Sequence, residues 1–179
     1  MLHAPDETAM PELQTAVGPL FYDVVDLTPP WVTDPPAIVF HHGVGATSGI
    51  WSGWLPVLAD AYRLVRFDMR GFGRSHRPAA GHAWTFDGMI DDLFAVAAAA
   101  GAKRFHLVGE SIGGTIALHA AATHGQALLS VTGVSCAHRG AAIGQVRTWR
   151  DEIAADGMAG WSRRMMAHRF HDGAISQAA

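Results

Sequence analysis

The sequence predicts an α/β protein with a mostly parallel sheet and helices on both of its faces. Short apolar runs alternate at least three times with segments of helical periodicity, which is the pattern of right-handed crossover units. The clearest run, residues 37–41, reads Ala-Ile-Val-Phe-His, as expected of a strand buried on both faces. Glycine-rich turns follow three of the runs. Because functional groups gather at the carboxyl ends of parallel strands, we expect a functional site at that edge of the sheet.

Apolar spacing and turn residues predict the elements in chain order. Strands are expected over residues 20–27, 37–41, 62–67, 105–108 and 128–135, and helices over residues 48–61, 85–100 and 115–123. A proline-rich connection between the first two strands cannot be helical. Thr85 is a candidate N-cap, and Gly101 and Gly125 are candidate helix ends.

Three parts are expected along the chain. Residues 1–17 are polar and contain proline, which indicates a flexible N-terminal arm, and residues 18–137 hold the α/β core. In residues 138–179 two apolar stripes of helical spacing flank Gly157. Two helices after a strand, with no strand to follow, favour a helical lid over another layer of the sheet.

Composition narrows the class of protein. Of the 179 residues 49% are hydrophobic and 16% are charged, which is typical of a globular protein. The net charge of -3 predicts no nucleic-acid partner and no anionic membrane partner, and no apolar run approaches the roughly 20 residues that span a bilayer. The single cysteine, Cys136, excludes an internal disulfide, and no metal-ligand spacing is present. We expect a cytoplasmic protein without metal or cofactor.

Residues 109–113 read Gly-Glu-Ser-Ile-Gly and fit the Gly-x-Ser-x-Gly nucleophile elbow. In that device a buried strand turns abruptly into a helix, and the serine at the turn adopts a strained backbone conformation. Small residues on either side let strand and helix pass closely. The competing interpretation is that Ser111 merely caps the helix.

With the elbow, the His-Gly-Val-Gly turn at residues 42–45 and Asp-Met-Arg-Gly-Phe-Gly-Arg-Ser at residues 68–75, the chain resembles the α/β-hydrolase superfamily. The resemblance covers residues 18–137. The segment Arg-Thr-Trp-Arg at residues 147–150, with Gly157 and Met158, is similar to that of 3-oxoadipate enol-lactonases and related carboxylesterases.

The resemblance implies a role for particular residues. Ser111 would attack the carbonyl of a small-molecule ester or lactone and form an acyl-enzyme. The backbone N–H groups of Val44 and Ile112 would form the oxyanion hole. Epoxide and haloalkane hydrolysis are disfavoured, because those relatives carry aspartate in place of Ser111.

The superfamily's acid and base follow the nucleophile on loops after later strands, and the chain offers no clear equivalents. His119 would already be about 12 Å along the helix that starts after Ser111. His168, His171 and Asp172 come in a permissible order but fall in the predicted lid. We therefore expect the N-terminal part of a longer hydrolase, whether by truncation, gene disruption or choice of expressed segment.

An incomplete sheet of this kind would leave its last strand as an open edge. Such an edge favours self-association or pairing with a complementary chain. Two other hypotheses stay open: a non-catalytic ligand-binding or interaction protein on the same fold, and one half of a split enzyme.

Several residues of reactive type have a simpler structural interpretation. His41 and His42 are expected to support the turn at the strand end. Asp68 and Arg70 are expected to form an ion pair that fixes the glycine loop. Glu110 is expected to point away from Ser111.

The tryptophans Trp149 and Trp161 lie in the predicted lid. They are candidates for lining an acyl pocket, because a lid packs against the cavity that it covers. A stripe at helical spacing equally fits packing between helices.

Overall fold

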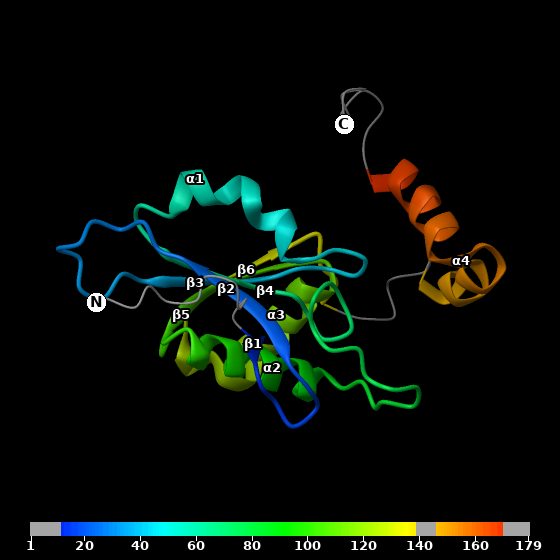
Figure 1. Ribbon diagram of the computed structural model, residues 1–179, viewed down its shortest axis with the longest axis horizontal. Coiled ribbons are helices and arrows are strands. Elements are labelled where there is room, and N and C mark those ends of the chain that lie inside the picture. The colour runs from blue at the N-terminus through cyan, green and yellow to red at the C-terminus, as the bar shows by residue number, and fades with distance from the viewer. Residues whose placement is uncertain (1–11, 139–145, 170–179) are drawn as a thin grey trace, which may run out of the picture. The chain divides into compact units, whose positions relative to one another are not determined.

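A computed structural model describes residues 12–138 and 146–169 (Figure 1). These residues belong to two compact units, Met1–His138 and Arg139–Ala179. The sequence predicted the division between residues 137 and 138.

The first unit is built on a six-stranded sheet with the order β1-β2-β4-β3-β5-β6. Its strands are β1 (Glu12–Leu13), β2 (Leu20–Val25), β3 (Ala37–His41), β4 (Arg63–Phe67), β5 (Phe105–Glu110) and β6 (Leu128–Val134). Strands β4, β3, β5 and β6 are parallel, whereas β1 and β2 run antiparallel to their neighbours. The mostly parallel α/β sheet predicted from the sequence is confirmed.

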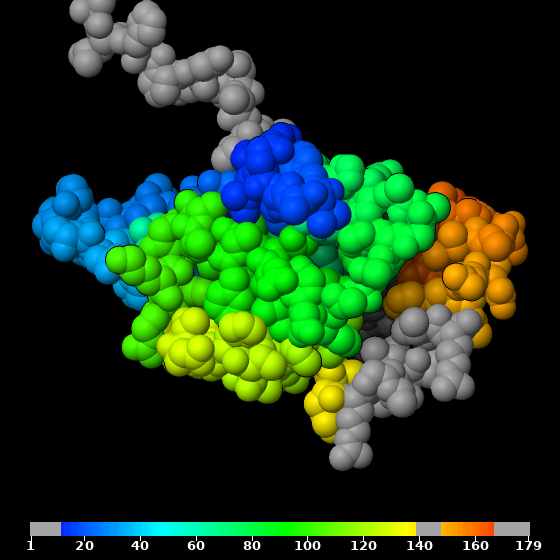
Figure 2. All heavy atoms as spheres, turned by 90° about the horizontal axis from the view of Figure 1, so that it is seen from below, coloured from blue at the N-terminus to red at the C-terminus, as the bar shows by residue number. Residues whose placement is uncertain are grey.

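Helices cover both faces of this sheet, as predicted. Figure 1 shows α2 (Phe86–Ala99) and α3 (Ile112–His124) on one side, and η1 (Ser48–Trp54) with α1 (Leu55–Leu58) on the other. Seen from the side of α2 and α3, their green to yellow side chains cover the sheet (Figure 2). The larger core cluster lies under these two helices, and a smaller one lies under η1 and α1. The face of the sheet under η1 and α1 is covered by less helix than the other face, because α1 has only four residues.

Local chemistry changes two element boundaries. The helix expected over residues 48–61 is instead a 3-10 helix followed by a short α-helix, in keeping with the low helix propensity of Gly49 and Gly53. The strand expected over residues 20–27 ends at Val25, because the Asp26 carboxylate accepts hydrogen bonds from the Thr28 N–H and hydroxyl.

The N-terminal arm expected over residues 1–17 is described from Glu12 onward. There the expectation of a flexible arm is wrong, since Glu12 and Leu13 pair with Phe21 and Leu20 of β2. Thr15 then closes a turn, because its hydroxyl donates to the Gly18 carbonyl at 2.7 Å. This turn brings residues 15–17 against the start of α2.

Strand β6 is an edge of the sheet and pairs only with β5. It reads Leu-Leu-Ser-Val-Thr-Gly-Val, contains no charge or proline, and exposes five of its seven residues. Edge strands usually carry charged residues or prolines, which block pairing with another strand. Strand β6 lacks both, so it can accept another strand. Self-association or pairing with a complementary chain stays a prediction.

The second unit is described by α4 (Val146–Arg169), which is two helical segments joined at Gly157. Gly157 has φ 67° and ψ 177°, a conformation outside the helical region, so the predicted break is confirmed. Arg164 bridges the break through ion pairs with Glu152 and Asp156. Across both units, no helix in the described ranges has the length and apolar character needed to cross a bilayer.

Candidate active site

The site predicted at the elbow begins with the backbone of Ser111. This residue lies between β5 and α3 with φ 56° and ψ -121°, in a region that residues with side chains rarely occupy. Its N–H donates to the Val134 carbonyl of β6 at 2.9 Å, and its carbonyl accepts from the Thr115 N–H at 3.1 Å. Bonds on both sides hold the strained turn, as expected where strain serves a function.

The Ser111 side chain does not cap the helix, although the residue stands at the N-cap position. Its hydroxyl forms no hydrogen bond with a residue in the described part of the chain, and the residue is half-buried. The helix-cap interpretation is therefore wrong. A turn that is strained without providing a cap leaves the hydroxyl available for other chemistry.

Two glycines allow three backbone segments to meet at this turn. A Cβ on Gly109 would lie 2.3 Å from the Gly113 carbonyl oxygen, and one on Gly113 would lie 2.3 Å from the His41 carbonyl oxygen. No real Cβ tolerates such contacts. Strand β5, helix α3 and the end of β3 are thus in direct backbone contact, which places the turn after β3 beside Ser111.

That turn, residues 43–46, is held by the ring of His42. The Met69 N–H donates to His42 Nε2 at 2.8 Å, so Nδ1 carries the proton and donates to the Gly43 carbonyl at 2.8 Å. Burial lowers the pKa of His42, in agreement with this neutral ring. The predicted supporting role of His42 is confirmed.

The Gly43 carbonyl belongs to the same peptide unit as the Val44 N–H. This carbonyl also accepts from the Ala46 N–H at 3.3 Å, so two bonds orient the peptide plane. In a trans peptide the N–H points opposite to the carbonyl. The Val44 N–H is therefore directed away from the His42 ring that holds the Gly43 carbonyl.

Ile112 is the first residue of α3, so its N–H has no acceptor inside the helix. It also stands at the positive end of a 13-residue helix. An anion near Ser111 would be stabilised by both features. The oxyanion-hole role of Val44 and Ile112 stays a prediction.

Asp68 ties the glycine loop that follows β4 to η1. The buried carboxylate accepts from the Ser48 N–H at 2.8 Å and from the Arg74 N–H at 2.9 Å. Burial raises the pKa of Asp68, but the hydrogen bonds from Arg74 and Ser48 outweigh it and hold the pKa below its usual value.

The expected ion pair between Asp68 and Arg70 is wrong, although the loop is fixed by ion pairs. Asp68 pairs with Arg74 at 3.1 Å, and Arg70 pairs with Asp92 of α2. Arg70 also donates to the Thr15 hydroxyl at 2.9 Å. Arg70 thereby joins the glycine loop to α2 and to the turn after β1, and it does not pair with Asp68 of the same loop.

His41 is fully buried beneath the elbow helix. Its Nδ1 lies 3.0 Å from the His42 carbonyl, and Nε2 has no hydrogen-bond partner in the described structure. Burial lowers the pKa of His41 to about 4. The ring stacks edge-on against Phe67 at 5.0 Å, so His41 supports the strand end, as predicted.

The candidate base His119 is not brought to Ser111, and no described side chain is hydrogen-bonded to the Ser111 hydroxyl. His119 lies seven positions along α3 from Ile112 and contacts Asp87 of α2 at 3.4 Å. His171, Asp172 and the side chain of His168 lie outside the described residues. In the described ranges no group of three or more His, Cys, Asp or Glu side chains could hold a metal ion.

Glu110 does not point away from the site, contrary to expectation. A Cβ on Gly43 would lie 2.3 Å from Glu110 Oε2 and 2.8 Å from Ser111 Cβ. The carboxylate and the nucleophile candidate therefore lie against the same glycine. The alternation of β5 explains this, because Phe105, Leu107 and Gly109 are buried while Glu110 is on the opposite, half-buried face.

Trp149 and Trp161 contact each other in the second unit, with ring centroids 5.1 Å apart and planes at 73°. Trp161 is 3% exposed. This contact supports the packing interpretation. A role of either tryptophan in binding an acyl group stays a prediction.

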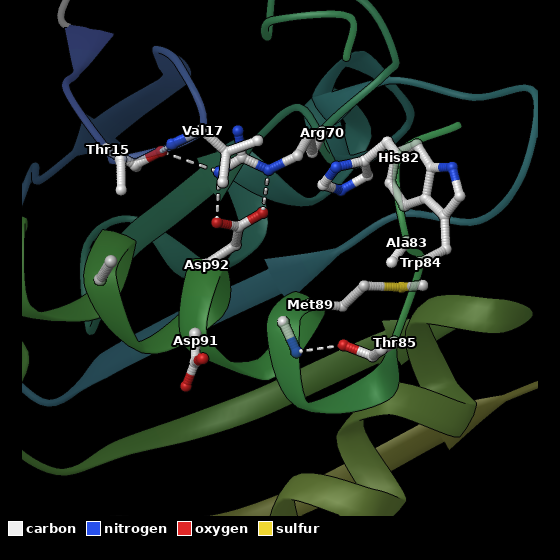
Figure 3. Close-up of a pocket in the computed structure, with 13 residues that line it drawn as sticks. Thr15, Val17, Arg70, His82, Ala83, Trp84, Thr85, Met89, Asp91 and Asp92 are labelled. Carbon is white, nitrogen blue, oxygen red and sulfur yellow. Dashed lines mark hydrogen bonds and ion pairs between the residues drawn. The ribbon is translucent and has the colours of Figure 1, made fainter. Parts of the chain in front are cut away.

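A cavity of roughly 310 Å³ lies between the turn after β1 and the start of α2 (Figure 3). The Arg70 and Asp92 pair forms one wall, and Trp84 and Met89 line another part. Neither Ser111 nor the two expected oxyanion donors line it. Sequence reasoning missed this cavity, because its walls come from segments that are distant in the sequence.

Known proteins share sequence and fold with this chain. A family model described as "alpha/beta hydrolase fold" matches residues 36–173. A fluoroacetate dehalogenase of a Burkholderia species is 35% identical over 99 residues, which are 54% of this chain and 33% of that protein. A pimeloyl-[acyl-carrier protein] methyl ester esterase of Methylococcus capsulatus is 35% identical over 97 residues, which are 54% of this chain and 35% of that protein.

Solved structures agree in fold. A hydrolase from Pseudomonas aeruginosa PA01 has a TM-score of 0.80 at 22% identity, covering 97% of this chain and 64% of that one. The enol-lactonase from Burkholderia xenovorans LB400 has a TM-score of 0.75 at 22% identity, covering 87% and 58%. The chain spans about a third of the length of the two curated relatives.

Proposed function

Since the chain belongs to the alpha/beta hydrolase fold family, we propose that it carries the nucleophile and oxyanion loop of a carboxylic ester or lactone hydrolase. The strained turn at Ser111, with its side chain unused as a cap, is the observation that carries this proposal. Similarity to an esterase and to the enol-lactonase fold supports the substrate class. The dehalogenase similarity supports only the shared fold and sequence ancestry.

The proposed reaction has two steps. Ser111 Oγ attacks the carbonyl carbon, its proton passes to a base, and the carbonyl electron pair moves onto the oxygen. The Val44 and Ile112 N–H groups bind that oxygen, and losing one such donor costs about 3 kcal/mol of transition-state stabilisation. The alkoxide then leaves with a proton, and water hydrolyses the acyl-enzyme. Serine receives the acyl group of the substrate, and water cleaves the resulting ester at its carbonyl carbon.

The base and its acid partner are proposed to come from outside the described residues, either from a longer form of the protein or from a second chain. The position of His119, which pairs with Asp87 of α2, supports this, and no described histidine is hydrogen-bonded to the Ser111 hydroxyl. For residues 1–179 alone we expect turnover of at most about 10³-fold above water, from binding and the oxyanion hole.

Labelling with a fluorophosphonate tests the nucleophile in the form of the protein, or in the complex, that supplies the base. Intact-mass and peptide mapping should place one phosphonyl adduct on Ser111, and Ser111→Ala should remove it. Ser162→Ala, which removes an exposed hydroxyl of the second unit, should label like the parent protein. An adduct elsewhere, or ester hydrolysis unchanged in Ser111→Ala, would refute the proposal. Saturable ligand binding without any adduct would instead support the non-catalytic alternative.

A further inference from the structure

Two features of β5 place the Glu110 carboxylate beside the nucleophile elbow. Glu110 is the last residue of the strand, so Ser111 follows it directly at the carboxyl end of the sheet. The strand alternation puts Glu110 on the same face as Val108, which packs with the smaller core cluster. The side chain thus stands beside the β3 turn and not beneath α3.

The Glu110 carboxylate points toward the turn at residues 43–46, which contains the expected oxyanion donor Val44. Oε2 and Cδ of Glu110 lie 2.3 Å and 3.2 Å from the position that a Cβ would occupy on Gly43. Gly43 supplies the carbonyl half of the peptide whose N–H is the expected oxyanion donor. A group bound at Ser111 would therefore meet the Glu110 carboxylate within a few ångströms of the reacting carbonyl.

No cation in the described structure offsets this carboxylate. The Glu110 side chain forms no hydrogen bond or ion pair with a described residue, and the partner of Glu110 across the sheet in β6 is Val134. Three arginines of the β4 region are each paired with another carboxylate: Arg66 with Asp23, Arg70 with Asp92 and Arg74 with Asp68. The negative charge of Glu110 can therefore act on a group that binds at Ser111.

We propose that Glu110 is a specificity residue that selects ester or lactone substrates with a cationic group near the scissile bond and rejects those with a carboxylate there. The inference rests on the proposed function, since it describes the charge preference of the same site. A single charge acting over several ångströms in a partly solvated site changes relative reactivity by on the order of tenfold. Substrates with a carboxylate near the scissile bond would react more slowly by that factor, and substrates with an ammonium group there would react faster by it.

Three fluorophosphonates of matched size, carrying a trimethylammonium, a tert-butyl or a carboxylate group, test this on the form of the protein, or the complex, that supplies the base. The second-order rate constant for Ser111 modification, measured by mass spectrometry at neutral pH, should fall in that order by about tenfold per step. Glu110→Gln should compress the whole series to within about threefold. High salt should compress it in part, because the site is partly open to solvent.

Asp91→Asn is the matched control, since it removes an exposed carboxylate on α2 and should keep the parent order. Equal rates for the three probes on the parent protein would overturn the inference, and this comparison does not depend on any variant folding. A uniform slowing of all three by Glu110→Gln would also overturn it and would indicate a positioning role. Absence of any Ser111 adduct would instead refute the proposed function.

Discussion

Acid should destabilise this protein through His41, whose buried ring has no hydrogen-bond partner for Nε2 among the described residues. The unfolded chain binds a proton at this residue below its ordinary pKa of 6.5, whereas the folded protein binds it only below about 4. Between these values unfolding takes up a proton, so the free energy of unfolding falls as the pH falls. Above pH 6.5 this stabilisation is fully present, and below about pH 4 no more is lost from this group.

The size of the effect follows from the two pKa values. A difference of about 2.5 pKa units corresponds to about 3 kcal/mol at about 1.4 kcal/mol per unit. His42 adds to the loss in the same direction, because burial also lowers its pKa. A change of this size is a large fraction of the total stability of a typical domain.

Urea unfolding followed by tryptophan fluorescence, at pH 7 and at pH 4, measures the loss. His41→Asn keeps a donor for the His42 carbonyl but does not titrate, so its loss should be about 3 kcal/mol smaller than that of the parent protein. His138→Asn removes an exposed histidine and should behave like the parent. If His41→Asn and the parent lose stability in parallel, the reasoning about the buried ring is wrong.

Two further substitutions examine the elbow and the glycine loop. Gly113→Ala should cost at least about 3 kcal/mol or prevent folding, because its Cβ would overlap the His41 carbonyl oxygen, whereas Gly125→Ala, with no atom within 4 Å, should be neutral; equal thermal midpoints for the two variants would contradict the close approach. Asp68→Asn should cost about 2 kcal/mol at pH 7, since it removes the buried charge that pairs with Arg74 and accepts the Ser48 and Arg74 N–H groups. Its difference from the parent should begin to shrink as the pH falls below 3.8 and should be lost once the pH passes the lower pKa of the folded Asp68 carboxylate; a difference that stays constant in urea titrations across this range would speak against this pair.

The elbow was predictable because its signal is local. Five consecutive residues after an apolar run contain the strand end, the turn and the helix start, and the structure bends at the residue expected. The strand and helix order followed for the same reason. Short-range signals also predicted Thr85 as an N-cap and the break at Gly157.

Pairings across the fold could not be predicted. Arg70 meets Asp92, which is 22 residues away, and Arg74, not Arg70, meets Asp68. Both choices depend on how the loop packs against α2 and η1. The direction of Glu110 was likewise mistaken, because an elbow motif specifies the backbone of its second residue but not the neighbour that its side chain meets in the turn after β3.

The contact between Gly113 and the His41 carbonyl has a mechanical consequence. Where two main chains touch with no side chain between them, no rotamer can absorb a displacement, so the bend at residue 111 and the loop after β3 must shift together or not at all. A substitution at a neighbour such as Glu110 can therefore alter the charge beside Ser111 without changing the spacing between the main chains of the bend and the loop.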